Sequence, residues 1–198
     1  MNKYVKMAAA LAMSTSLSAS AGAITVSGKS FNDRGTSVVD KSTSLEWMDF
    51  TTTLSRSTCS VVKDAGAAVP VGCSSFDSLD TIQDLDGWRL ATRAETAQLL
   101  SNWFGMPIGL YSSGFVSHTL AQQFLSVFAD GAEYVRPNFF PDAPSPVQAV
   151  GFFIGAFGEV GQYSMDFYNA NINSGIVGTA LVRAAGARVP EPASVALL

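Results

Sequence analysis

Charged residues are scarce in this chain. Asp, Glu, Lys and Arg make up 14% of its 198 residues, against about 25% in typical domains. The net charge is −4 at pH 7, whereas nucleic acid attracts proteins with clustered Lys and Arg. Serine, threonine, asparagine and glycine are common instead, which suits a protein outside the cell. We therefore expect no nucleic-acid partner.

Catalytic and cofactor motifs are missing as well. The sequence has no G-x-S-x-G, no H-E-x-x-H and no glycine-rich phosphate loop of the known spacings. Its one histidine, His118, cannot build an ordinary zinc site. His118 lies near an expected helix start, where a surface or capping role is favoured over general-base chemistry. These patterns predict no catalytic residue, no metal ligand and no cofactor.

The densest group of acids lies between residues 77 and 86. It comprises Asp77, Asp80, Asp84 and Asp86. The letters DLDG within it match part of a calcium loop, but the EF-hand pattern fails around them. We interpret the group as a solvated acidic face, with a calcium site as the alternative.

Cysteine is limited to two residues, Cys59 and Cys73. An even number of cysteines in an exported chain indicates a disulfide, and two cysteines allow one pairing. The bond would close a loop of about 15 residues, rich in Ala and Gly, and contribute roughly 3 kcal/mol. A catalytic or metal-binding thiol pair is the alternative, but the spacing is not C-x-x-C.

The first 23 residues have the layout of a secretory signal. Lys3 and Lys6 precede an apolar stretch, small residues follow, and no acid occurs in the segment. We expect signal peptidase to cut after Ala23 or, alternatively, after Ala21. An amphipathic first helix is disfavoured because no polar face recurs at helical spacing. Removal of residues 1–23 would lower the net charge to −6.

The mature body, residues 24–188, has the size of one domain. Its expected class is α+β, with twisted antiparallel strands and two or three helices. A helix is expected over residues 117–128, and helical turns are expected over 75–87. Strands are expected at four places: 23–31, the two arms of 36–50 around a turn at Asp40–Ser42, 88–90, and several segments after Pro146.

The segment GWRLATRAETAQLLSNWFG, residues 87–105, holds the clearest local signal. Thr92 and Glu95 form a T-x-x-E capping box at the start of a helix that Gly105 ends. The helix would bury a stripe that includes Ala94, Ala97 and Leu100, continued by Trp103 or Phe104. Trp47, Trp88 and Trp103 could stack on sugars, but their patterned contexts favour burial.

Three segments resemble exported bacterial domains of the DUF1566 kind: VVDKSTSLEWMDF, GWRLATRAE and GTALVRA. The middle one is also similar to a motif of formylglycine-generating sulfatase modifiers. Both resemblances imply a C-type-lectin-like fold with its chain ends close together. The motif residues Trp88, Arg89, Leu90, Thr92 and Glu95 are expected to be structural. The two cysteines precede the motif, unlike the active-site pair of the sulfatase modifiers, so that oxidative chemistry is not implied.

The C-terminal letters VPEPAS resemble the PEP-CTERM sorting signal, carried here by Val189, Pro190, Glu191 and Pro192. In that family a transmembrane helix and several arginines follow, and the membrane enzyme exosortase processes the tail. Here six residues follow, about 9 Å of helix against a hydrocarbon core of about 30 Å. We expect residues 189–198 to be a sorting signal that is truncated or has decayed. This segment would anchor the protein in the membrane, transiently, only if the full helix followed it. A chance proline-rich tail is the alternative.

Two functions fit these expectations. The first is a non-enzymatic protein of the cell surface or extracellular matrix, exported by a Gram-negative bacterium that makes exopolysaccharide, and binding exopolysaccharide or another envelope component. The second is a secreted hydrolase that cleaves polysaccharide with a pair of carboxylates. The acids of residues 77–86 are the only candidates for that pair that the sequence indicates.

Overall fold

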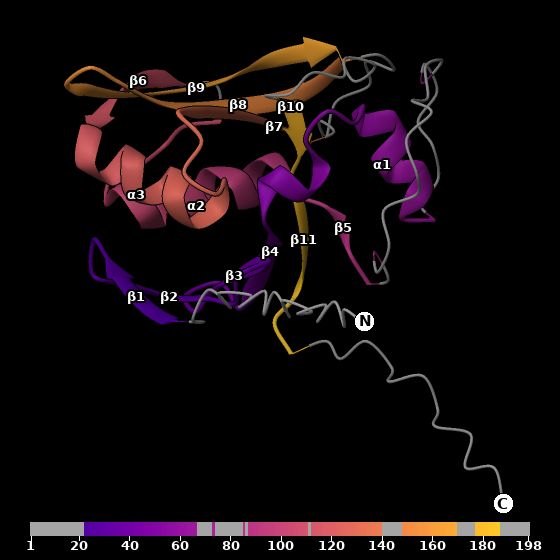
Figure 1. The fold of residues 1–198 in the computed structure, drawn as a ribbon, viewed down its shortest axis with the longest axis horizontal. Helices are drawn as coiled ribbons and strands as arrows, with labels where there is room; N and C mark the ends of the chain where they lie inside the picture. The colour runs from indigo at the N-terminus through magenta and orange to yellow at the C-terminus, as the bar shows by residue number, and fades with distance from the viewer. Residues whose placement is uncertain are drawn as a thin grey trace, which may run out of the picture.

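Two β-sheets enclose a pair of helices (Figure 1). The structure, a computed structural model, describes residues 22–66, 73, 85, 87–110, 112–139, 148–169 and 177–186. Helices α2 (Arg93–Phe104) and α3 (His118–Phe128) lie between the sheets, and helix α1 (Thr58–Asp64) lies to one side. This is the mixed α+β class that the sequence predicts.

The first sheet has six antiparallel strands in the order β1-β2-β3-β4-β11-β5. Its C-terminal strand, β11, lies between β4 and β5 and pairs with both. The strands are β1 (Gly22–Val26), β2 (Lys29–Asp33), β3 (Ser37–Asp40), β4 (Leu45–Met48), β5 (Arg89–Leu90) and β11 (Leu181–Ala184).

The second sheet has five strands in the order β10-β7-β8-β9-β6. Its pairs are antiparallel except for β10 with β7, which run parallel. The strands are β6 (Ser113–Ser117), β7 (Tyr134–Phe139), β8 (Gln148–Phe157), β9 (Val160–Asn169) and β10 (Val177–Thr179). Helices α2 and α3 lie against one face of this sheet, which leaves its other face outside (Figure 1).

Aromatic side chains dominate the core between the two sheets. Trp103 of α2 packs edge-on against Phe124 and Phe128 of α3, with ring centroids 5.5 and 5.4 Å apart. Its indole N–H donates to the carbonyl of Leu120 at 3.0 Å, so the polar atom of a fully buried ring is satisfied. Phe31 of β2 lies 4.8 Å from the same ring and joins the first sheet to the helices.

Several predicted elements are confirmed. The two arms of residues 36–50 form β3 and β4, α2 starts at the Thr92 cap and ends at Gly105, and α3 covers residues 118–128. Gly105 has a φ of 68°, the left-handed conformation that glycine adopts at a helix end.

Other predictions were wrong. Residues 23–31 form two strands instead of one, because Ser27 and Gly28 both have positive φ and make a tight hairpin turn. The segment after Cys59 is helical as α1, whose Val61 and Val62 are buried; their packing overrides their weak helix propensity. Strands β6 and β7 were not expected.

The burial prediction for α2 was partly wrong. Ala94 is exposed, whereas Arg93, Thr96 and Asn102 are buried with the predicted Ala97 and Leu100. Because α2 lies between two sheets, it is covered on more than one side and does not show a single apolar stripe. None of the helices in the described part of the chain is long and apolar enough to cross a membrane.

Candidate ligand-binding surface

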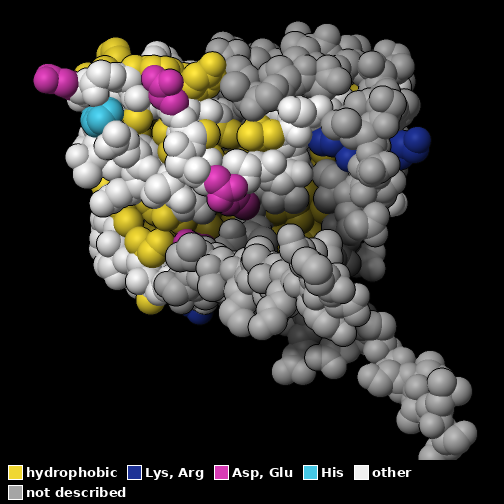
Figure 2. Space-filling model, viewed as in Figure 1, with side chains coloured by type: hydrophobic (Ala, Val, Ile, Leu, Met, Phe, Trp, Pro, Cys, Tyr) yellow, Lys and Arg dark blue, Asp and Glu magenta, His cyan; other side chains and the backbone are white. Residues whose placement is uncertain are grey.

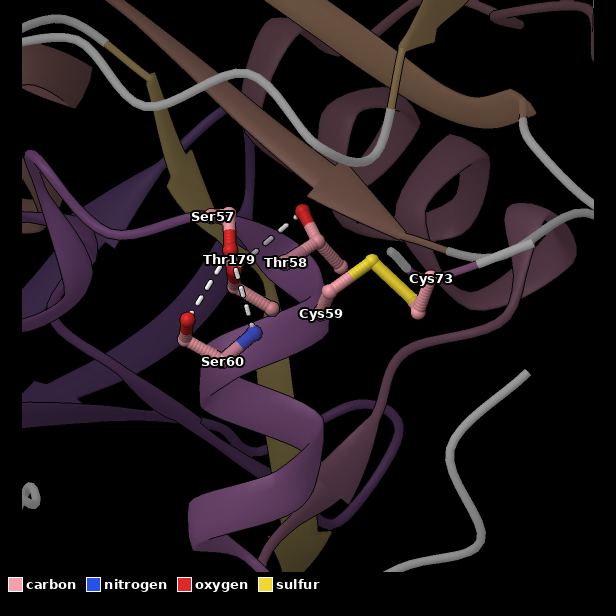
Figure 3. The surroundings of a disulfide bond; sticks show 6 residues. All are labelled: Ser57, Thr58, Cys59, Ser60, Cys73 and Thr179. Atoms are coloured by element: carbon pink, nitrogen blue, oxygen red, sulfur yellow. Dashed lines mark hydrogen bonds between the residues drawn. A yellow bond between two sulfur atoms is a disulfide. The ribbon is translucent and has the colours of Figure 1, made fainter. Parts of the chain in front are cut away.

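The predicted disulfide is confirmed. Cys59 in α1 and Cys73 are bonded, with their Cα atoms 5.5 Å apart (Figure 3). Ser57 caps α1 by accepting the amide of Ser60, and Thr58 reaches Thr179 of β10 with 3.5 Å between the hydroxyl oxygens. The two cysteines therefore form a structural disulfide that joins residue 73 to the buried helix α1, and neither is a free thiol that could act in catalysis or bind a metal.

Trp88 is part of the structure and not a sugar platform. It is 8% exposed and packs with Met48, Leu181 and other residues in a small second apolar cluster. The guanidinium carbon of Arg183 lies 4.3 Å from its ring centroid. Trp47 and Trp103 are also buried, so the expectation of core burial is confirmed for all three tryptophans.

Arg183 also pairs with the buried carboxylate of Glu46 at 3.0 Å. Arg34 and the Ser37 hydroxyl bind the other oxygen of that carboxylate. Burial by itself would raise the pKa of Glu46, but these hydrogen bonds and the two positive charges lower it below its ordinary value. Glu46 therefore stays ionised, and it is unsuited to act as a general acid.

The capping box of α2 is present as predicted. The Thr92 hydroxyl accepts the amide of Glu95, and the Glu95 carboxylate accepts the amide of Thr92 at 2.8 Å. Arg89 forms two further hydrogen bonds with the same carboxylate, at 2.9 and 2.5 Å. The hydrogen bonds from Arg89 lower the pKa of Glu95 to about 2. Trp88, Arg89, Leu90, Thr92 and Glu95 thus make structural contacts.

Two carboxyl groups meet across Thr51. Its hydroxyl oxygen lies 2.9 Å from Asp49 and 2.6 Å from Asp130, although it has one hydrogen to donate. Burial raises the pKa of Asp49, and hydrogen bonds from Thr51 offset that rise in part. Asp49 is 4% exposed, whereas Asp130 is exposed, so only one of the two carboxyl groups can meet a ligand from solvent.

Other predicted site residues lie outside the described residues. These are the acids Asp77, Asp80, Asp84 and Asp86 and the sorting motif Val189 to Pro192. Within the described part of the chain, no group of three or more His, Cys, Asp or Glu residues could hold a metal ion. Ala23, one of the two expected cleavage positions, lies within β1 and pairs with Asn32.

The outer face of the second sheet carries three aromatic rings close together. Tyr134 of β7 faces Gly155 of β8 in the register, and Phe153 and Phe157 flank that glycine on the same face. The ring centroids are 5.7 to 6.0 Å apart, and the two phenylalanine rings are nearly parallel at 12°. We call Tyr134, Phe153 and Phe157 the outer aromatic patch.

Alternation along β7 and β8 places this patch on the outside. Val135 and Ile154, the neighbours of Tyr134 and Phe153, are fully buried in the core. Phe157 is 36% exposed and Phe153 is 9% exposed, so the patch presents mainly Phe157 and part of Tyr134 to solvent. Figure 2 shows hydrophobic side chains along the upper left of the molecule, where this sheet lies.

Gly155 allows the rings of Phe153 and Phe157 to lie close together. A Cβ atom at this position would lie 2.8 Å from an atom of each phenylalanine ring, closer than side-chain atoms approach. The two rings therefore converge over the bare backbone of Gly155 and cover it, as aromatic residues do over strand glycines.

Uncharged polar groups of β9 lie beside the patch. Gln162 and Ser164 of β9 lie on the same face, and Gln162 is exposed. A hollow of about 400 Å³ lies beside the same ends of β7 and β8, lined in part by Gln122 and Glu133. The surface can therefore offer ring stacking and hydrogen bonds to a ligand.

Sequence reasoning did not single out these rings. The usable signal was the alternation F-x-G-x-F in residues 153–157, which places aromatic residues on the face of an antiparallel strand that is normally polar. Comparisons of the chain with protein-family models, with curated proteins and with solved structures find no match.

Proposed function

We propose that this chain is an exported, non-enzymatic protein of the cell surface or extracellular matrix that binds an uncharged polysaccharide. The outer aromatic patch is the observation that carries the proposal. Sugar rings present C–H groups that stack on aromatic faces and hydroxyl groups that pair with amides and hydroxyls. Phe157 and Tyr134 supply the stacking surface, and Gln162, Ser164 and the Tyr134 hydroxyl supply hydrogen-bond partners.

Electrostatics favour a neutral polymer over an acidic one. The chain has a net charge of −4 at pH 7. An acidic polysaccharide would therefore meet repulsion from the molecule as a whole. Two of the described acids are unsuited to the hydrolase alternative, since Glu46 is held by two arginines and Asp49 is buried.

The resemblances complete the proposal. The segments that carry the DUF1566 resemblance contain β3, β4, β5 and β11, which are neighbours in the first sheet. This supports a C-type-lectin-like arrangement. We further propose that signal peptidase and an exosortase-type enzyme process the two ends. Cleavage after Ala21 would leave all of β1 in place, whereas cleavage after Ala23 would remove two residues that pair with β2.

The test is affinity electrophoresis of the exported protein in gels that contain dextran, a soluble β-glucan or alginate. We expect the neutral polymers to retard the protein and alginate to have no effect. The Phe157→Ala variant should bind the retarding polymer about tenfold more weakly, equivalent to about 1.4 kcal/mol. Met106→Ala, which truncates another exposed apolar side chain far from the patch in sequence, is the matched control.

Three results would count against the proposal. The first is binding of the polymer by the Phe157→Ala variant with the same affinity as the parent, which would show that the patch does not contact the polymer. The second is retardation by alginate alone, which would contradict the neutral ligand. The third is release of new reducing ends from a polymer during incubation, which would favour the hydrolase.

A further inference from the structure

Strand β6 is an open edge of the second sheet. It pairs with β9 on one side, and none of the described strands lies on the other. Phe115 at its centre is 70% exposed, the highest value among the exposed large apolar residues of the described chain. Phe115 lies opposite the exposed Gln162 and therefore on the outer face of the sheet.

The hydrogen-bond pattern shows which backbone groups of β6 point away from the sheet. The amide of Met165 donates to the carbonyl of Ser112 at 2.9 Å, so these two residues form a hydrogen-bonded pair. Such pairs alternate along an antiparallel ladder. Gly114 and Val116 therefore bond to β9, whereas Ser113, Phe115 and Ser117 direct their N–H groups to the free edge.

The opposite edge of the same sheet is closed. On β10 the amide of Thr179 donates to the Thr53 hydroxyl at 2.7 Å, and that hydroxyl lies 3.2 Å from the Thr179 carbonyl. The residues of β6, Ser-Gly-Phe-Val-Ser, include no charge and no proline, which are two common protections of an edge strand.

We propose that two copies of this chain pair through β6 in antiparallel orientation, about a two-fold axis at Phe115. The two Phe115 residues then exchange both backbone hydrogen bonds. The Ser117 amide of each copy donates to the Ser113 carbonyl of the other, while the Ser117 carbonyl serves α3 as the N-cap carbonyl. The same side chain, Phe115, stacks on its equivalent because residues opposite one another share a face.

Charge favours a second copy at this place. Both copies carry a net negative charge, so a neutral contact surface avoids local repulsion between them. Strand β6 is neutral, with serine at both ends and Phe115 at its centre. Two antiparallel copies therefore place serine opposite serine and phenylalanine opposite phenylalanine. One five-residue strand buries less than a standard interface, so we expect a weak dimer whose population depends on concentration.

Sedimentation equilibrium of the exported protein from micromolar to millimolar concentration tests the proposal. We expect a reversible monomer–dimer equilibrium. Phe115→Ala should raise the dissociation constant, and Phe115→Pro should raise it further, because proline also removes the outward amide. An edge strand tolerates proline where its N–H faces solvent, so circular dichroism of the Phe115→Pro monomer should match the parent. Met106→Ala should leave the equilibrium unchanged.

A second measurement keeps the two-fold axis testable if Phe115→Pro does not fold. Phe115→Cys should form a disulfide-linked dimer on oxidation, and Ser126→Cys, exposed on α3, should not. A monomer at every concentration would overturn the proposal. Dimerisation that is equally strong in Phe115→Ala and the parent, or equal cross-linking of both cysteine variants, would overturn it too.

Discussion

Glu95 shows how one side chain can join several local structures. Its carboxylate accepts hydrogen bonds from the Thr92 amide and hydroxyl and from Arg89, and so joins β5 to the start of α2. The hydrogen bonds from Arg89 account most for its low pKa, about 2. Because the folded state favours the ionised form, the contribution of Glu95 to stability must depend on pH.

We predict that Glu95→Gln lowers the free energy of unfolding by about 1 kcal/mol at pH 7. The folded pKa lies below the unfolded value of 4.5, so this contribution is present above pH 4.5 and is lost as the pH falls toward 2. Urea unfolding at pH 7, 4.5 and 2.5 should show the parent and the variant converging. A difference that stayed constant over this range would contradict the role of the carboxylate charge.

Among the elements, α1 depends most on its surroundings. It has seven residues, too few for a stable isolated helix, and its Val61 and Val62 have weak helix propensity. Ser57 caps it, the Arg56–Asp64 ion pair lies beside it at 2.6 Å, and the disulfide joins Cys59 to residue 73. The helix therefore exists because burial and the covalent bond hold it.

We predict that replacing both cysteines by alanine lowers the free energy of unfolding by about 3 kcal/mol, the value for a loop of this length. Denaturation in urea measures the change. Addition of a reductant to the parent should produce a similar loss, and the same reductant should not affect the double variant. An unchanged midpoint in the reduced parent would show that packing alone holds α1.

For the molecule as a whole, the two proposals have a joint consequence. Pairing through β6 continues the second sheet into the second copy, and opposite residues share a face. The two outer aromatic patches would then lie on the same side of one extended sheet. A long polymer could contact both patches, whereas a short oligosaccharide could contact one.

We predict that Phe115→Pro weakens binding of a long neutral polymer at least tenfold while leaving the affinity for its short oligosaccharides unchanged, since linkage of two sites raises avidity without new contacts. Isothermal titration with both ligands, at a concentration where the parent is dimeric, makes the comparison. Equal loss for short and long ligands would place Phe115 in the sugar contact itself and not in the dimer.

Elements stabilised by contacts between near neighbours in the sequence were predictable. The capping box needs residues three apart, Gly105 ends α2 through its own φ, and the turn between β3 and β4 uses residues 41–44. The disulfide was predictable because two cysteines allow one pairing. In each case the interaction that decides the structure is visible within a short stretch or follows from a count.

The outer aromatic patch and the open edge were not predictable in this way. Tyr134 meets Gly155 across two strands, and the outward direction of the Phe115 amide depends on the pairing of Ser112 with Met165. Cross-strand register sets both, and a shift of one residue would turn every side chain to the other face. Local propensity does not specify that register; burial of Val135, Ile154 and Tyr163 against the helices does, because it fixes which face of the second sheet points inward.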